Sequence, residues 1–338
     1  MKCTAKIGTF LNLAIKCPRR GDTLYLALET SLFFLFICCM LLLTSYGCQG
    51  KQVLYKDTQV IMGTFVEVIS PDQRAAQIVF NEIKRIDNLL SKYKPDSEIS
   101  QLNSLGKLRV SDDTMYVLGK AKEFYLASDG EFDITVGPLL DLWGFSEHKY
   151  YLPTAEEIKN AKSRVGFNKI ILNEGDNMIE FSIPGMKVDL GGIAKGFAVD
   201  CAVKKLKEAG IKSCLINAGG QIHCLGDKFG KAWQIAIRNP RTEGLFETLQ
   251  LKDKAVSTSG DYQQFFIKNK KRYSHILSPK TGGPVNNGIA SVTVVASDGL
   301  TADALSTTIF AIGIKRWEAL SKKYPDVRVK IIEDQFAQ

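Results

Sequence analysis

Asp189-Leu190-Gly191-Gly192-Ile193-Ala194-Lys195-Gly196 is the stretch of sequence that says most about the fold of this chain. It places a carboxylate at the end of an expected short strand, followed by two glycines whose missing side chains let a ligand or an ion approach the backbone. A helix is expected over residues 193–209, and backbone N–H groups at a helix start attract anions. The stretch therefore predicts a strand, a tight turn and a helix start that can receive a phosphate group.

A second segment, Thr301-Ala302-Asp303-Ala304-Leu305-Ser306-Thr307-Thr308, complements the first. On the helix expected over residues 301–312, Asp303 and Thr307 are four positions apart, so a carboxylate and a hydroxyl share one helix face. A hard cation such as Mg²⁺ prefers oxygen ligands of this kind, completed by a backbone carbonyl, water and phosphate oxygens. Together the two segments predict a site for a metal and a phosphate.

Each of these residues also has an ordinary structural explanation. Two glycines before a helix often form only a tight turn, and Lys195-Gly196 does not match the P-loop pattern, which needs a Ser or Thr after the lysine. Asp303 can be an acid that the helix dipole favours in a first turn, and Thr307 can be a packed side chain. The residues alone leave a metal site and a purely structural role open.

The length and charge of the chain are typical of an exported single-domain enzyme. The chain has 338 residues, and 44 Lys and Arg against 36 Asp and Glu give a net charge of +8. Residues 1–47 hold five basic and two acidic residues, so they supply +3 and leave a modest +5 for the rest. Because the sequence shows no zinc spacing, RNA-binding signature or basic stripe with interleaved aromatics, nucleic acid is not expected as a partner.

The N-terminal region has the features of an export signal. An unbroken apolar run over residues 32–43 follows three basic residues and is too short for a comfortable transmembrane span. Gly47-Cys48 resembles the end of a bacterial lipobox, although the two residues before it depart from the usual pattern. We expect residues 1–47 to be a lipoprotein signal peptide and residues 48–56 a short linker. Cys48 would then be lipidated and anchored on the outer, periplasmic side of the cytoplasmic membrane; an uncleaved membrane anchor is the alternative.

Residues 57–338 are predicted to form one α+β domain with a mixed or antiparallel sheet core and flanking helices. Alternating apolar residues predict a strand over residues 59–69, and helical spacing predicts a helix over residues 74–93. Ser111 and Thr154 are expected helix caps, and Asp176-Asn177 is expected to close a hairpin. Further strands are expected over residues 213–217, 221–225, 233–238, 247–251, 265–268, 272–276 and 289–296, and a further helix over 315–323. The remaining cysteines, Cys201, Cys214 and Cys224, show no CxxC spacing and are interpreted as core residues.

From about residue 55 to the C-terminus, the chain resembles the ApbE family of FAD:protein FMN transferases. The resemblance rests on many short segments that follow one another in the order of the family. These are Met62-Gly63-Thr64, Ser91-Lys92-Tyr93, Ser97-Glu98-Ile99-Ser100 with Asn103, the run from Gly130 to Leu139 with Leu142-Trp143-Gly144-Phe145, the run from Asp189 to Gly196, Asn217-Ala218-Gly219-Gly220, Ser257-Thr258-Ser259-Gly260-Asp261-Tyr262, His275-Ile276-Leu277-Ser278-Pro279 and Ala302-Asp303-Ala304-Leu305-Ser306-Thr307.

The resemblance implies a reaction and a set of site residues. The family cleaves the pyrophosphate of FAD, attaches FMN to a threonine hydroxyl of a partner protein through a phosphoester bond, and releases AMP. FAD, the substrate, is then expected in a cleft of the ApbE fold, in contact with Met62, Tyr93, Glu131, Phe132, Asp133, Asp189, Lys195 and Leu277. Mg²⁺ is expected on Asp303, Thr307 and a carbonyl at the Gly192 position. The implied acceptor is a membrane electron-transport subunit.

His275 and Asp303 are the residues expected to be catalytic. The chain has three histidines, and only His275 lies in a matching motif. An imidazole of near-neutral pKa could accept the proton of the attacking threonine hydroxyl, although a half-buried structural histidine is equally ordinary. Phe132 and Tyr93 could likewise be core aromatics, and Asp133 a strand-end acid. Ser278 stands where the family usually has Asp, which weakens any role for a carboxylate there.

The sequence leaves two other functions open. A hydrolase would cut FAD to FMN and AMP with water in place of threonine, whereas a non-catalytic flavin-binding lipoprotein should lack a usable metal pair. The presence of Asp303 and Thr307 argues against the binding protein. Ser297-Asp298-Gly299-Leu300-Thr301 partly resembles the sequence context of flavinylated acceptors, but Asp-Gly before a helix is an ordinary turn and cap, so self-modification at Thr301 is not expected.

Overall fold

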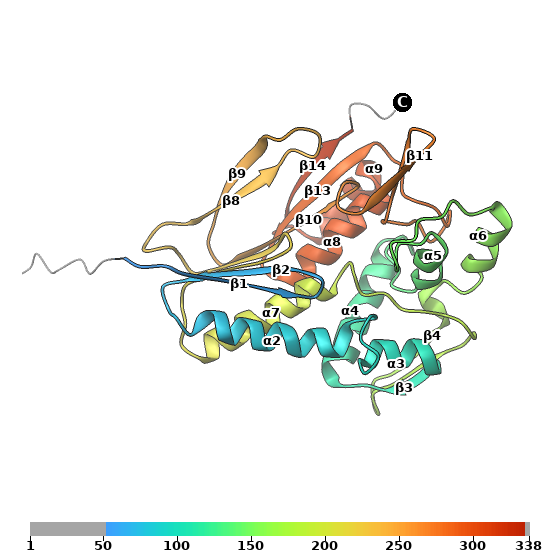
Figure 1. Ribbon diagram of the computed structural model, residues 1–338, viewed down its shortest axis with the longest axis horizontal. Coiled ribbons are helices and arrows are strands. Elements are labelled where there is room, and N and C mark those ends of the chain that lie inside the picture. The colour runs from blue at the N-terminus through green and yellow to red at the C-terminus, as the bar shows by residue number, and fades with distance from the viewer. Residues whose placement is uncertain (1–51, 335–338) are drawn as a thin grey trace, which may run out of the picture. The chain divides into compact units, whose positions relative to one another are not determined.

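A seven-stranded sheet forms the centre of the computed structural model, which describes residues 52–334 (Figure 1). The strand order is β1-β2-β6-β7-β10-β13-β14, and every neighbouring pair is antiparallel. The strands are β1 (Tyr55–Ile61), β2 (Thr64–Ser70), β6 (Cys214–Ala218), β7 (Gln221–Leu225), β10 (Lys254–Gly260), β13 (Ile289–Ala296) and β14 (Arg328–Glu333). The predicted α+β domain with an antiparallel sheet core is confirmed.

Three helices cover one face of this sheet. They are α2 (Ala75–Leu90), α7 (Ala194–Glu208) and α8 (Gly299–Ile312), and α7 packs against both of the others (Figure 1). The alternation of β2 explains this packing, because Val66 and Val68 are buried in the helix-covered core while Phe65 is exposed.

A hairpin covers part of the opposite face of the sheet. It consists of β8 (Trp233–Arg238) and β9 (Leu245–Leu251), and its buried Trp233 packs with Val256 of β10 and Val295 of β13. Strand β13 is buried along its whole length because it is covered on both faces. The middle of the sheet is therefore a rigid platform, and its β1–β2 end has less cover on the hairpin side.

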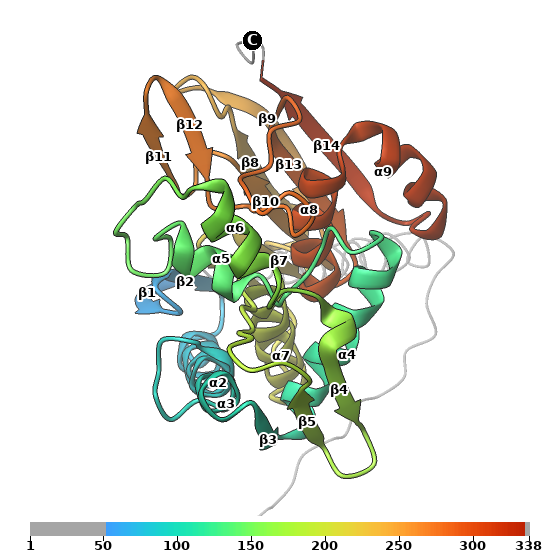
Figure 2. The same cartoon turned by 90° about the vertical axis from the view of Figure 1, so that its right-hand side faces the viewer.

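The remaining elements surround one end of the sheet (Figure 2). They are the helices α3 (Glu98–Leu105), α4 (Asp112–Ala127), α5 (Gly137–Leu142), α6 (Ala155–Lys162) and α9 (Ile314–Leu320), the 3₁₀ turns η1 (Phe167–Lys169) and η2 (Ser321–Lys323), the small sheet β3 (Lys107–Arg109), β5 (Met178–Phe181) and β4 (Ile170–Asn173), and the hairpin β11 (Phe265–Lys268) and β12 (Lys271–Ser274).

Several local predictions are confirmed. Ser111 caps α4 by accepting a hydrogen bond from the Thr114 amide, and Thr154 forms a capping box at the start of α6. Asp176-Asn177 lies in the connection of the β4–β5 hairpin. Cys201, Cys214 and Cys224 are free thiols, and two of them are fully buried, as expected for core residues.

Two predictions of strands were wrong. Residues 59–69 form two strands, because Met62 and Gly63 both have positive φ angles, of 55° and 69°, and turn the chain back on itself. The short strand expected before Asp189 is reduced to a single bridge between Lys187 and Val136. In place of a strand partner, the Asn103 amide group binds the backbone N–H and C=O of Val188, at 2.6 and 2.9 Å.

The predicted signal peptide and residues 48–51 of the predicted linker, Cys48 included, lie outside the described residues. Export and lipidation therefore stay predictions from the sequence. Between residues 52 and 334, the structure contains no helix that is both long enough and apolar enough to cross a membrane.

Candidate active site

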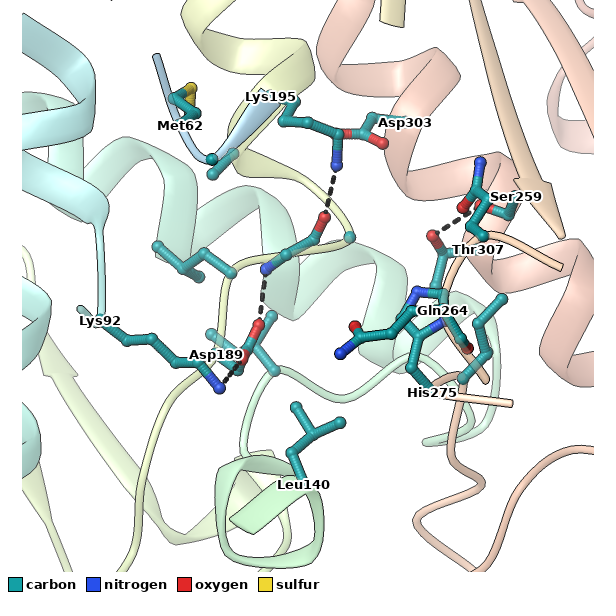
Figure 3. A pocket seen from close by; sticks show the side chains of 18 of the residues that line it. Met62, Lys92, Leu140, Asp189, Lys195, Ser259, Gln264, His275, Asp303 and Thr307 are labelled. Atoms are coloured by element: carbon teal, nitrogen blue, oxygen red, sulfur yellow. Dashed lines mark hydrogen bonds and ion pairs between the residues drawn. The ribbon is translucent and has the colours of Figure 1, made fainter. Parts of the chain in front are cut away.

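A cavity of about 870 Å³ contains all the site residues that the sequence predicts. Its wall is built from the β1–β2 turn, the loop after α2, the segment before α5, the start of α7, the β6–β7 turn, β10, and α8 (Figure 3). Met62, Tyr93, Glu131, Phe132, Asp133, Asp189, Gly192, Lys195, His275, Leu277, Asp303 and Thr307 all line it. Thr301 does not line the cavity.

Asp303 is a buried carboxylate held by neutral donors. One oxygen accepts a hydrogen bond from the Gly196 amide at 3.0 Å, and the other accepts one from the Ser257 hydroxyl at 3.2 Å. The residue is only 3% exposed, and within residues 52–334 no Lys, Arg or His side chain forms an ion pair with it. A buried charge without an opposite charge is costly, so this carboxylate is suited to an added cation.

Hydroxyl groups gather beside Asp303. The Thr307 Oγ1 lies 3.1 Å from the Ser259 Oγ, which in turn lies 2.8 Å from the Ser306 Oγ (Figure 3). The prediction that Asp303 and Thr307 share one helix face is confirmed, because both lie on α8 and line the same cavity.

Gly192 and Gly196 bring the loop after Asp189 close to α8. A Cβ atom at Gly192 would lie 3.2 Å from the Thr307 side chain, and one at Gly196 would lie 2.2 Å from the Gly299 carbonyl oxygen. The missing side chains therefore let the Gly192 backbone approach Thr307. The approach of a ligand or an ion to this backbone, which the double glycine predicts, stays a prediction.

These oxygen atoms fit a hard cation. Asp303 supplies a carboxylate, Thr307 a hydroxyl and the neighbouring loop backbone carbonyls, which are the ligand types that Mg²⁺ takes together with water and phosphate. Within residues 52–334, no group of three His, Cys, Asp or Glu side chains is arranged to hold a metal. A cation at Asp303 would therefore depend on hydroxyl, carbonyl and substrate oxygens, and such a site favours Mg²⁺ over zinc.

Lys195 lies in the first turn of α7, as predicted. Its Nζ donates a hydrogen bond to the Gly191 carbonyl oxygen at 3.0 Å, and its side chain lines the cavity on the same side as Asp303 (Figure 3). The described part of the chain offers this ammonium group no carboxylate partner within 4.0 Å. A cation beside a helix start can bind a phosphate.

Asp189 forms an ion pair with Lys92 across the cavity wall. The carboxylate lies 2.7 Å from the Lys92 Nζ, and each side chain is 14% exposed (Figure 3). Burial alone would raise the pKa of Asp189, but the charge of Lys92 and hydrogen bonds from Lys92 and the Gly191 amide hold it below its usual value. Lys92 also donates to the Ser146 hydroxyl at 2.8 Å. Asp189 is therefore an ionised group with a fixed partner.

His275 presents one ring nitrogen to the protein. Its Nδ1 lies 3.1 Å from the backbone carbonyl oxygen of Gln264, which can only accept, so Nδ1 carries the proton and Nε2 is an acceptor. Burial lowers the pKa of His275, and the charge of Lys195 lowers it further, whereas the Gln264 hydrogen bond and the charge of Asp189 act in the opposite direction. The ring is therefore neutral at physiological pH and can accept a proton at Nε2.

Other predicted residues have different surroundings. Glu131 accepts a hydrogen bond from the Ser278 hydroxyl at 3.0 Å and lies near Arg316, whose Nη1 is 3.5 Å away. The Ser278 hydroxyl thus binds a carboxylate, at the position where an Asp was expected from the resemblance. One oxygen of Asp133 accepts hydrogen bonds from Thr135 in its own turn, and the other accepts one from the Phe167 amide of another segment. Burial raises the pKa of Asp133, against the effect of these hydrogen bonds.

Phe132, Leu277, Met62 and Tyr93 give the cavity its apolar surfaces. Phe132 and Leu277 are buried, and Phe132 packs at a ring distance of 5.8 Å against Phe124. Tyr93 is 66% exposed and stands beside the Lys92 ammonium group, 5.0 Å from its ring centre. Tyr93 is therefore not a core aromatic, which was the structural alternative for it.

The sequence prediction missed several residues of the cavity wall. Among the polar ones are Lys92, Ser257, Ser259, Gln221 and Gln264. Lys92 and the two serines lie within the motifs quoted above, but only their contacts give them a role. The side-chain oxygen of Gln221 is buried and has no hydrogen-bond partner among the described residues, and no sequence pattern could have indicated this.

The chain is similar to known proteins over this whole region. The sequence model of the ApbE family matches residues 62–331, and this range contains every residue of the cavity wall. An FAD:protein FMN transferase of Haemophilus influenzae is 37% identical over 243 residues, which cover 68% of this chain and 70% of that protein. The crystal structure of the ApbE protein from Thermotoga maritima matches with a TM-score of 0.77 and 31% identity, over 85% of this chain and 100% of that one. The flavin transferase ApbE from Vibrio cholerae matches with a TM-score of 0.76 and 30% identity, over 84% and 95% of the two chains.

Proposed function

Because the chain belongs to the ApbE family, we propose that it transfers FMN from FAD to a threonine hydroxyl of an acceptor protein, with Mg²⁺ and with release of AMP. FMN transfer from FAD to a protein is the activity that the relatives share by name. The single observation that supports the finer proposal is the buried carboxylate of Asp303. It lines the same cavity as Lys195 and His275 and lacks a cationic partner within residues 52–334.

Different residues of the cavity would bind the metal, the pyrophosphate and the flavin ring. Asp303, Thr307 and a carbonyl at Gly192 would hold Mg²⁺, which when bound neutralises phosphate charge. Lys195 and the amides at the start of α7 would bind the pyrophosphate from the adjoining side. The apolar surfaces of Phe132, Met62 and Leu277 suit an aromatic ring.

The transfer step needs one group that accepts the proton of the threonine hydroxyl. The threonine Oγ forms a bond to the phosphorus of the FMN part, the bond from that phosphorus to the bridging oxygen breaks, and AMP leaves with the electron pair. The threonine proton goes to a base, for which we propose the Nε2 of His275. Its Nδ1 is already committed to Gln264, so the ring has the tautomer that this step needs.

One product assay tests the proposal. The purified protein is mixed with FAD, Mg²⁺ and an acceptor fragment that bears the Asp-Gly-x-Ser/Thr context and an acceptor threonine. We expect a flavin adduct that survives denaturation, one AMP for each adduct, and little free FMN. If FAD is instead consumed to FMN and AMP at the same rate with and without acceptor, and no flavin stays on denatured protein, the chain is a hydrolase.

A further inference from the structure

The tip of the β1–β2 hairpin exposes two apolar side chains beside the cavity. Val60 is 68% exposed and Phe65 is 71% exposed, and they are directly opposite each other in the antiparallel pair. The turn that follows Val60, residues 62–64, lines the cavity. An exposed aromatic and an exposed β-branched side chain in one cross-strand pair form a small apolar surface, which we call the Val60–Phe65 pair.

The pair stands out against the rest of its sheet face. Further along β2, Glu67 forms an ion pair with Lys56 of β1, and beyond it Ile69 packs against the apolar cluster beneath the β8–β9 hairpin. This face is thus covered at one end, charged in the middle and bare only at the end next to the cavity. Apolar residues without cover are costly in water, and their position next to a site indicates a partner.

The backbone of the pair adjoins the cavity wall. The Phe65 carbonyl oxygen accepts a hydrogen bond from the Gly219 amide at 3.1 Å, and Gly219 and Gly220 line the cavity. A Cβ atom at Gly220 would meet nothing within 4 Å, so the space above this turn is open. Met62, in the hairpin turn, lies on the same side of the cavity as Lys195 and Asp303 (Figure 3). The pair therefore lies beside the part of the cavity where phosphate is expected.

We propose that the Val60–Phe65 pair is the docking surface for the acceptor protein, and that it takes an apolar side chain close to the acceptor threonine. The proposal rests on the proposed function. A threonine hydroxyl that reaches the phosphorus beside Lys195 belongs to a protein that stays outside, so that protein must cover the rim of the cavity. Well-packed aromatic side chains supply most of the binding energy at such contacts.

The test compares acceptor binding in the parent and in the double variant Val60→Ser/Phe65→Ser. With saturating FAD and the acceptor fragment described above, we expect the KM for acceptor to rise about tenfold, as for loss of a central interface contact. The dissociation constant for FAD and the midpoint of thermal unfolding should not change. Ile171 of β4 is 55% exposed and does not line the cavity, so Ile171→Ser is the control and should leave the KM for acceptor unchanged.

Each other outcome has a distinct meaning. If the parent forms no adduct, the proposed function fails. If the parent forms adduct and the double variant has the same KM for acceptor, the docking proposal is overturned while the function stands. A weaker affinity for FAD in the variant would also overturn it, because the pair would then support the cavity. So would sedimentation that shows a dimeric parent and a monomeric variant, because a second copy would then cover the pair.

Discussion

Two carboxylates on opposite sides of one cavity have different partners (Figure 3). Asp189 forms a 2.7 Å ion pair with Lys92, whereas Asp303 receives only an amide and a hydroxyl, from Gly196 and Ser257. The charge of Asp189 is thus neutralised by the chain itself. No cationic side chain within residues 52–334 neutralises the charge of Asp303, so this charge is available to a bound cation. The function of a carboxylate can therefore be inferred from the lack of a cationic partner as well as from its contacts.

The two arrangements also differ in what they allow to move. Lys92 is tied to Asp189 and to Ser146, so this side of the cavity is fixed before any ligand arrives. Around Asp303 and Thr307 the partners are short hydroxyl side chains, which can reorient when a cation and phosphate oxygens enter. We therefore expect the Asp189 side to govern binding of FAD and the Asp303 side to govern the rate of transfer.

The largest expected effect comes from removing the charge of Asp303. Asp303→Asn keeps the size of the side chain but removes the one anionic metal ligand, so kcat should fall by about 100-fold or more and should no longer depend on Mg²⁺ concentration. Thr307→Val, which removes only a neutral hydroxyl, should lower kcat several-fold at most. Steady-state rates of adduct formation over a Mg²⁺ titration measure both. Full activity of Asp303→Asn in the presence of a chelator would remove the metal from the proposal.

His275 should give the next largest effect, on both rate and pH dependence. Loss of a general base in His275→Gln should cost on the order of 100-fold in kcat. Because burial lowers the pKa of His275, the parent should keep its activity below pH 6.5 and lose it only as the pH falls through that lowered pKa, where Nε2 becomes protonated. In the variant this acidic limb of the kcat/KM profile should disappear. An unchanged limb would assign the proton transfer to another group.

Much of the fold could be predicted from local sequence, because the relevant physics is local. The capping box at Thr154 and the cap at Ser111 need only a few neighbouring residues, and both are confirmed. The β1–β2 hairpin was missed because alternation continues through its turn, and a left-handed residue such as Met62 has no distinctive sequence signal. Strands β10 and β14 were not predicted, because β10 is rich in serine and its burial comes from tertiary packing.

The sequence predicted residues that line one cavity, but it did not predict the contacts between them. The motifs and the family resemblance identified residues that all line one cavity. They could not show that Asp133 accepts a hydrogen bond from the Phe167 amide, or that Lys92 pairs with Asp189, because these contacts join segments far apart in the sequence. Pairing over such distances is decided by the tertiary fold.

The smallest effect, and the sharpest test of the comparison, should come from Lys92→Met. It leaves Asp189 buried without its cation, so the KM for FAD should rise several-fold while kcat changes less. The double variant Lys92→Met/Asp189→Asn should recover part of the loss, because no buried charge then lacks a partner. Without Lys92, burial should raise the pKa of Asp189. As the pH falls through that raised pKa, the carboxylate becomes neutral, so the loss of FAD affinity in Lys92→Met should become smaller. FAD titrations of the parent and both variants between neutral and mildly acidic pH measure this. If the double variant binds FAD no better than Lys92→Met at any pH, the ion pair does not set the charge of this side of the cavity, and the contrast with Asp303 loses its basis.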